Sequence, residues 1–97
     1  MTKSDFMTRF EWDPEKANRN LSKHGVSFRA GERFEFPSAL EFIDDRENYG
    51  EERVVSIGFI GEVLHTMAYT ERNGLIRIIS LRKSTTAEIK RYAKAYE

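Results

Sequence analysis

The first third of the chain combines apolar positions with residues that mark the ends of helices. Asp13 and Pro14 fit the N-cap and the first position of a helix, and Gly25 fits its C-cap. Ser27 is placed to cap a second helix, which Pro37 is expected to stop. The pattern therefore predicts a short aromatic strand over residues 9–12 and helices over residues 13–24 and 28–35.

The second half alternates apolar and polar positions in the way that β-strands require. Asn73-Gly74 is the strongest hairpin signal, because a type I′ turn needs positive φ at both of its central residues. Gly61-Glu62 predicts a second tight turn. Thr85 or Thr86 caps a final helix, and the pair Thr86 and Ile89 lacks the acid of a full capping box. The pattern predicts strands over residues 39–43, 53–60, 63–70 and 75–81, and a helix to about residue 96.

This order of elements predicts an α+β fold in one domain over residues 1–97. We expect an antiparallel sheet, built from a three-stranded meander plus edge strands. Two N-terminal helices and one C-terminal helix are expected to pack on one face of it. The opposite face is then free to bind a ligand.

Composition excludes several classes of protein. The chain has 97 residues, no cysteine and no net charge, so disulfides, a thiolate nucleophile and cysteine-based metal sites are excluded. No segment approaches the ~20 apolar residues that span a bilayer, and residues 1–10 lack the apolar run of a signal peptide. The sequence therefore predicts a cytoplasmic protein without a membrane segment.

The charges are unevenly distributed although they balance overall. Residues 41–52 hold six acids against Arg46, and residues 77–94 hold six bases against Glu88. A basic patch at the C-terminal end can meet phosphates. The alternative is that it forms the solvated face of a helix.

The candidate chemistry depends on basic residues, because the two histidines have no metal-ligand spacing and no glycine-rich phosphate loop occurs. We predict no metal and no cofactor. Arg82 shares a predicted strand face with Ile76, Ile78 and Ser80, and there it needs an anion, either a carboxylate or a phosphate. Arg53 opens the first strand of the meander. A structural ion pair is the alternative for both arginines.

Cleavage of RNA without a metal needs a base, cations at the phosphate and an acid. Arginine suits the role of the cation at the phosphate because its planar guanidinium binds two phosphate oxygens at once. Lys23, His24 and Glu71 can move protons if their pKa values are shifted. His24 has a structural alternative, since a histidine at a helix C-terminus commonly binds backbone carbonyls or packs against the helix.

Several segments, in their order along the chain, resemble the BrnT toxin family. Residues 10–28 (FEWDPEKANRNLSKHGVSF) look like its N-terminal signature, and residues 52–53 (ER), 69–72 (YTER) and 77–83 (RIISLRK) resemble its later ones. The resemblance implies a RelE-like fold and a type II toxin that cleaves RNA and blocks translation. It also implies a BrnA-type antitoxin, which binds the toxin and represses their shared operon, so that contact with operator DNA goes through the antitoxin.

The resemblance carries functional positions onto matching residues of this chain. On this interpretation Arg53 and Arg82 hold the scissile phosphate, Glu71 or Lys23 is the base, and His24 is the acid. Three further cations are expected to bind substrate: Arg77, Arg72 and Lys83. The alternative is a catalytically silent module that acts with the antitoxin in transcriptional control.

The chain departs from the family pattern at two places. Residues 34–37 read FEFP where Phe-x-Asp-Pro is usual, which puts Phe36 in the place of an acid. After Ser80 the chain reads Leu-Arg-Lys-Ser where Ala-Arg-x-Ala is usual. The second departure puts the larger Leu81 beside Arg82.

Overall fold

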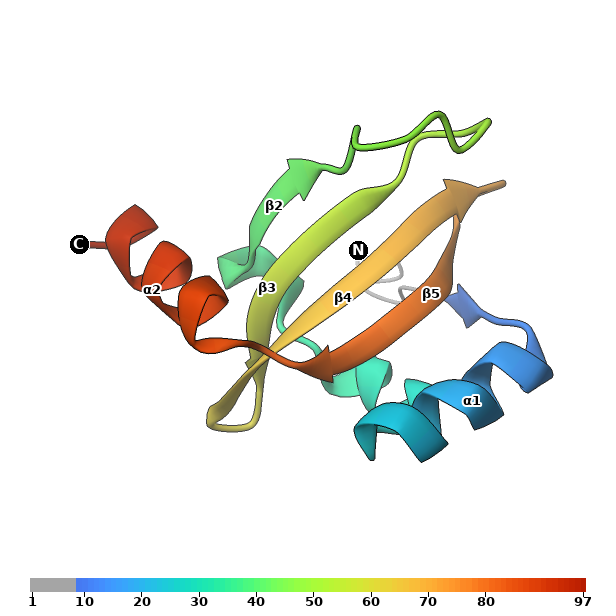
Figure 1. Cartoon of the computed structure of the whole chain (residues 1–97), viewed down its shortest axis with the longest axis horizontal. Helices are drawn as coiled ribbons and strands as arrows, with labels where there is room; N and C mark the ends of the chain where they lie inside the picture. The colour runs from blue at the N-terminus through green and yellow to red at the C-terminus, as the bar shows by residue number, and fades with distance from the viewer. Residues whose placement is uncertain (1–8) are drawn as a thin grey trace, which may run out of the picture.

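The computed structural model describes residues 9–97 and shows a five-stranded mixed sheet with helical segments around it (Figure 1). The strand order is β1-β5-β4-β3-β2. The elements are β1 (Phe10–Glu11), α1 (Pro14–His24), η2 (Phe28–Arg33), η3 (Phe36–Ser38), β2 (Leu40–Ile43), β3 (Val54–Ile60), β4 (Val63–Arg72), β5 (Leu75–Lys83) and α2 (Thr86–Ala95). The prediction about residues 1–10 falls largely on residues 1–8, which lie outside the described part.

The sheet corrects the expectation of purely antiparallel pairing. β2, β3, β4 and β5 pair antiparallel, but β1 runs parallel to β5, with Phe10 opposite Ile76 and Glu11 opposite Arg77. No tight turn joins β1 to β5, so nothing local sets the direction of this pair. The parallel pairing is therefore decided by the path of the chain through α1 and the segments that follow it.

The boundaries of the predicted helices and turns are confirmed at several places. The Asp13 side chain accepts a hydrogen bond from the Glu15 amide at the start of α1, and Gly25 ends the helix with φ of 73°. Asn73 and Gly74 have φ of 52° and 79°, as a type I′ turn requires.

The C-terminal helix begins with a full capping box, which corrects the expectation of an incomplete one. The box joins Thr85 and Glu88, each of which accepts a hydrogen bond from the backbone amide of the other. The pair considered from the sequence was displaced by one residue.

The helix predicted over residues 28–35 is instead the short 3₁₀ segment η2, and Pro37 lies within the further 3₁₀ turn η3 rather than ending a helix. The reason lies in its close approach to the sheet. A Cβ on Gly31 would be 3.0 Å from the Ile78 Cδ1 and 3.1 Å from the Met67 Cε. Phe28 and Phe34 from this segment enter the main core, together with Val26, Met67, Tyr69, Ile76, Ile78 and Leu81.

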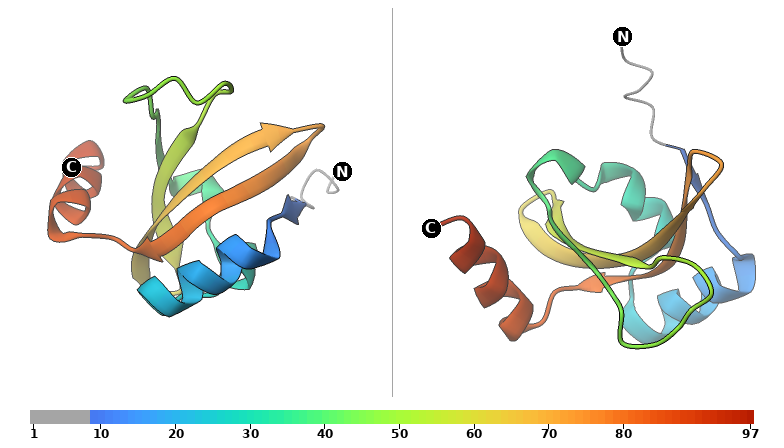
Figure 2. Two further views of the ribbon diagram at one scale, coloured as in Figure 1. Left: turned by 45° about the vertical axis from the view of Figure 1, so that its right-hand side comes forward. Right: turned by 90° about the horizontal axis from the view of Figure 1, so that it is seen from above.

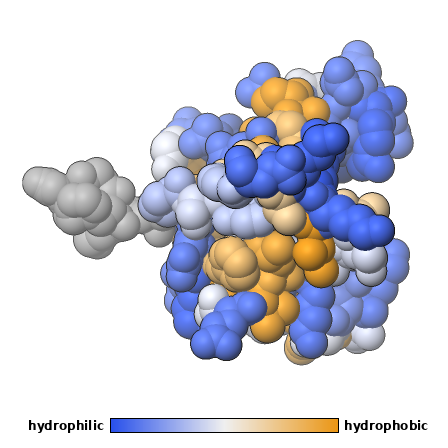
Figure 3. All heavy atoms as spheres, turned by 90° about the vertical axis from the view of Figure 1, so that its left-hand side faces the viewer, coloured by the Kyte–Doolittle hydropathy of each residue, from blue (hydrophilic) through white to orange (hydrophobic). Residues whose placement is uncertain are grey.

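The helical segments do not all lie on one face, which corrects a further expectation. In Figure 2, right, η2 and η3 cover one side of the sheet, whereas α1 and α2 flank the other side. The loop before β3 lies between α1 and α2 in this view. On the α2 side, hydrophobic residues remain at the surface among hydrophilic ones (Figure 3). Ile43 and Ile89 are each about half exposed.

An irregularity in β5 changes which residues share a face. Ser80 pairs with Ala68 and Ile78 pairs with Tyr69, so Ile79 is an extra residue in β5. Ile78 is consequently buried in the core, and Ser80 points to the opposite face. Arg82 follows Ser80 to that face, so the prediction that it shares a face with Ile76 and Ile78 is wrong.

The same irregularity determines the position of Leu81, which stands where the family pattern usually has the smaller Ala. Leu81 is fully buried in the core cluster beneath η2. Alternation places it on the opposite face of β5 from Arg82. The larger side chain therefore packs in the core and does not crowd the arginine.

Candidate functional site

A surface that we call the basic groove runs along α1 and the open face of β5. It consists of two adjoining hollows, of about 350 and 130 Å³, that share Lys16 and Ile79. The first hollow is also lined by Arg19, Asn20, Lys23, His24 and Ser80. The second is also lined by Tyr49, Glu51, Arg53, Thr70, Arg72 and Arg77.

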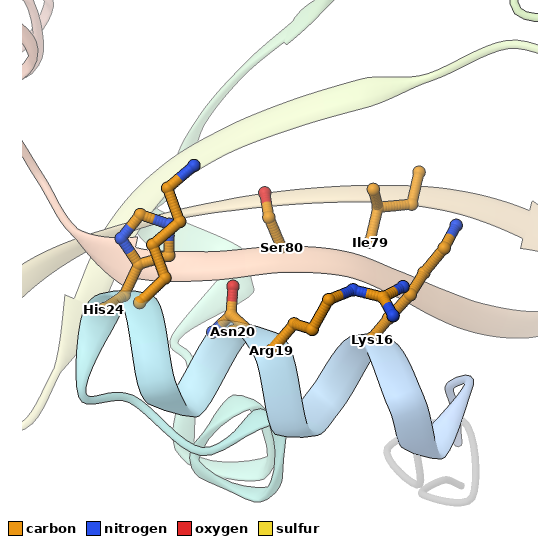
Figure 4. Close-up of a pocket in the computed structure, with 7 residues that line it drawn as sticks. Lys16, Arg19, Asn20, His24, Ile79 and Ser80 are labelled. Carbon is orange, nitrogen blue, oxygen red and sulfur yellow. The ribbon is translucent and has the colours of Figure 1, made fainter.

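The first hollow takes its charge from one side of α1. Lys16, Arg19 and Lys23 are three and four residues apart, which puts them on one side of a helix over about 10 Å. Figure 4 shows Lys16, Arg19 and His24 on the side of α1 that looks towards Ile79 and Ser80 of β5. None of the residues from 9 to 97 that line this hollow is an acid.

Asn20 fixes α1 against the sheet. Its Nδ2 donates to the Val26 carbonyl at 3.0 Å and to the Leu81 carbonyl at 2.7 Å, and its Oδ1 accepts from the Leu81 amide at 3.2 Å. The side chain thus satisfies backbone groups of β5 in the way that a neighbouring strand would. Asn20 is buried, so these three bonds set the position of the groove's helical side.

Arg53 is the central cation of the second hollow. Its guanidinium lies 3.7 Å from the centroid of the Tyr49 ring. Within residues 9–97, the Arg53 Nε is the one buried side-chain nitrogen or oxygen without a hydrogen-bond partner. The side chain is therefore held face-on by an aromatic ring while a buried donor stays unused.

The other arginines of the second hollow have carboxylate partners. Arg72 binds Glu51 at 2.5 Å, and Arg77 lies 3.5 Å from Glu11. The hydrogen bonds from Arg72 lower the pKa of the Glu51 carboxyl, which is thus ionised at neutral pH. Among residues 9–97, Arg53 has no such partner. The two hollows together carry more positive than negative charge, which favours an anionic ligand.

His24 lies at the far end of the first hollow. Partial burial, followed by the nearby charges of Lys23 and Arg82, lowers the pKa of His24 below its ordinary value. Its imidazole is therefore neutral at pH 7, and a neutral imidazole can accept a proton. This combination of a neutral histidine and an adjacent lysine is suited to moving protons.

Arg82 lies outside the basic groove, and its anion is a carboxylate. Its two terminal nitrogens donate to the two oxygens of Glu88 at 2.7 and 2.9 Å. Glu88 also belongs to the capping box of α2, and the bonds from Arg82 lower its pKa to about 2. Arg82 thus links β5 to the start of α2. It lines a separate hollow with Phe42 and Arg91.

Two further predicted site residues are not brought to the groove. Glu71 lies opposite Ile76 in the register, so alternation places it on the η2 face of the sheet. Lys83 is exposed at the end of β5 and lines neither hollow. The structure thus brings together Lys23, His24, Arg53, Arg72 and Arg77, and leaves Arg82, Lys83 and Glu71 apart.

Several groove residues were missed as candidates from the sequence, among them two basic residues of α1 and two residues that line the hollow of Arg53. Lys16 and Arg19 had a signal, since they share the helical stripe of Lys23. Thr70 lies within the 69–72 motif, although it was not singled out there. Tyr49 had no signal, because a loop brings it to Arg53 only in the fold.

Within residues 9–97, no three side chains of His, Cys, Asp or Glu lie close enough together to form a metal site. No helix in the same residues has the length and apolar character to cross a membrane.

Comparisons with known proteins identify a matching family and a solved structure of similar fold. A family model described as the ribonuclease toxin BrnT of type II toxin–antitoxin systems matches residues 12–88. The crystal structure of the Brucella abortus ribonuclease toxin BrnT is similar, with a TM-score of 0.66 and 24% identity over 82% of this chain and 100% of that one. A search of curated proteins finds no match. The family match covers most of the chain, which therefore belongs to the BrnT family of ribonuclease toxins of type II toxin–antitoxin systems.

Proposed function

We propose that this toxin is a metal-independent endoribonuclease whose basic groove binds the sugar-phosphate backbone of RNA. The observation that supports this most is the state of Arg53. Its guanidinium is half-buried, has no carboxylate partner among residues 9–97, and keeps a buried donor unused. A desolvated cation of this kind is costly unless a ligand supplies an anion. A phosphate matches its planar fork of donors.

The proposed reaction uses the substrate's own 2′-hydroxyl as the nucleophile. The 2′-oxygen forms a bond to phosphorus, and the bond from phosphorus to the 5′-oxygen breaks. The products are a 2′,3′-cyclic phosphate and a free 5′-hydroxyl. Arg53, Arg77 and Lys16 stabilise the negative charge that develops on the five-coordinate phosphorus.

We place the scissile phosphate in the basic groove between Arg53 and His24, beside Ile79 and Ser80 of β5. His24 then takes the proton of the 2′-hydroxyl, since its lowered pKa keeps it neutral. Lys23 protonates the leaving 5′-oxygen. This assignment reverses the roles expected from the sequence, where His24 was the acid. Arg82 stays outside the phosphate site because its guanidinium is bound to Glu88.

Incubation of purified protein with RNA tests the reaction. Cleavage should persist in excess EDTA and leave 2′,3′-cyclic phosphate ends, and a 2′-O-methyl group at the cleaved position should block it. Activity that disappears with EDTA and returns with magnesium would contradict the mechanism. A folded protein that cleaves no RNA, alone or with ribosomes, would support the catalytically silent module instead.

The pH dependence of cleavage tests the role of His24. If neutral His24 is the base, kcat/KM should fall as the pH drops through a pKa below 6.5. His24→Gln should reduce the rate by about 10²–10⁴-fold and remove this limb of the profile. Asn18→Gln, an exposed change on the same helix, is the control. A rate that rises as His24 becomes protonated would make it the acid.

We further propose a BrnA-type antitoxin as the partner and inhibition of translation as the result of cleavage. The antitoxin would make the contacts with operator DNA. The half-exposed Ile43 and Ile89 support a protein contact. Hydrophobic residues are also exposed among hydrophilic ones on the α2 side (Figure 3). We also propose that the mixed sheet, with its groove on the open face, is a RelE-like variant.

A further inference from the structure

We propose that Tyr49 is a positioning residue for Arg53, and that it holds the guanidinium with its donor edge turned to the substrate phosphate. This inference rests on the proposed function. The central contact is the stacking of the Arg53 guanidinium on the Tyr49 ring, at 3.7 Å from the centroid. Tyr49 lines the same hollow as Arg53.

The geometry explains why a ring serves better than a carboxylate at this place. A carboxylate would bind the guanidinium edge-on and occupy the donors that a phosphate needs, as Glu51 does with Arg72. A ring binds the guanidinium by its face, so the N–H groups along the edge stay available. The Arg53 Nε is covered by protein and has no partner, so the donors left for a phosphate are the two terminal nitrogens.

The ring of Tyr49 is itself held in place. Its hydroxyl donates to Asp44 Oδ2 at 3.2 Å, and Arg46 donates to both oxygens of Asp44 at 2.8 Å. Asp44 is buried, and the hydrogen bond from Arg46 lowers its pKa to about 2. The Asp44 amide also donates to the Arg53 carbonyl at 2.8 Å, which closes the base of the loop. The hydrogen bonds of Asp44 thus fix the position of the Tyr49 ring against Arg53.

The test compares Tyr49→Phe with Tyr49→Leu, each in the wild-type and the Arg53→Ala background. The probe is a short RNA with 2′-O-methyl groups throughout, which binds without cleavage, and fluorescence anisotropy gives its Kd. Tyr49→Leu should weaken binding by about 5- to 10-fold, whereas Tyr49→Phe keeps the ring and should change it less than 2-fold. In the Arg53→Ala background, Tyr49→Leu should have no further effect.

A structural role would give a different pattern. An equal loss from Tyr49→Leu in both backgrounds, or no loss in either, would overturn the inference. If Arg53→Ala leaves both binding and cleavage unchanged, the proposed phosphate site fails as well, so the two failures are distinguishable. Should Tyr49→Leu fold poorly, the NMR signal of the Arg53 Nε proton reports the contact directly. The ring should shift it upfield in the wild type and in Tyr49→Phe, and an unshifted signal in both would also overturn the inference.

Discussion

Arg53→Ala is expected to lower the rate of RNA cleavage by about 10²–10³-fold while the protein stays folded. The reason is that Arg53 combines partial burial, the absence of a carboxylate partner within residues 9–97 and a place in the lining of the second hollow. Its contact with phosphate should strengthen as charge develops in the transition state. Single-turnover rates at saturating protein measure this step without the contribution of binding.

Two further variants sharpen this measurement. Arg53→Lys keeps the charge but loses the planar fork, so we expect an intermediate rate. Arg33→Ala removes an exposed arginine of η2 on the opposite side of the sheet, and it should leave the rate unchanged. Full activity of Arg53→Ala at wild-type stability would mean that the arginine is structural and that the phosphate lies elsewhere.

Asn20→Leu is expected to lower the free energy of unfolding by about 3 kcal/mol. The substitution keeps roughly the same volume but removes hydrogen bonds to three backbone groups, the amide and carbonyl of Leu81 and the carbonyl of Val26. These groups are buried, and each one that is left without a partner loses its hydration without compensation. Urea denaturation followed by circular dichroism measures the change.

The exposed neighbour Asn18 supplies the control. Asn18→Leu lies on the same helix without these bonds and should change the free energy of unfolding by less than about 0.5 kcal/mol. Asn20→Asp should also destabilise, because a carboxylate would face two carbonyl oxygens. Equal stability of Asn20→Leu and the wild type would show that α1 does not depend on this bridge to β5.

Arg53 was identified as a candidate site residue from the sequence, whereas the role of Asn20 was missed. Arg53, Arg77, Lys23 and His24 were named from motif resemblance, and the structure brings them into one groove. The role of Asn20 had no local signal, because its partner Leu81 is 61 residues away along the chain. The hydrogen bonds between Asn20 and Leu81 depend on where the edge of β5 lies relative to α1 in the folded protein.

The sequence by itself determined the features that depend on neighbouring residues. The start of α1 at Asp13 and Pro14 and its end at Gly25 follow from capping geometry. The turn at Asn73-Gly74 follows from the positive φ that both residues tolerate. The resemblance of the motifs to the BrnT family, confirmed over residues 12–88, is likewise a property of the sequence.

Only the tertiary structure decided the features that depend on distant partners. Strict alternation along β5 put Arg82 with Ile76 and Ile78, but the extra residue Ile79 moved it to the opposite face, where Glu88 binds it. The parallel pairing of β1 and the stacking of Tyr49 on Arg53 also needed the folded chain. The physical reason is that a bulge, an edge pairing or a cation–π contact is selected by the energy of the whole packing, which no short segment encodes.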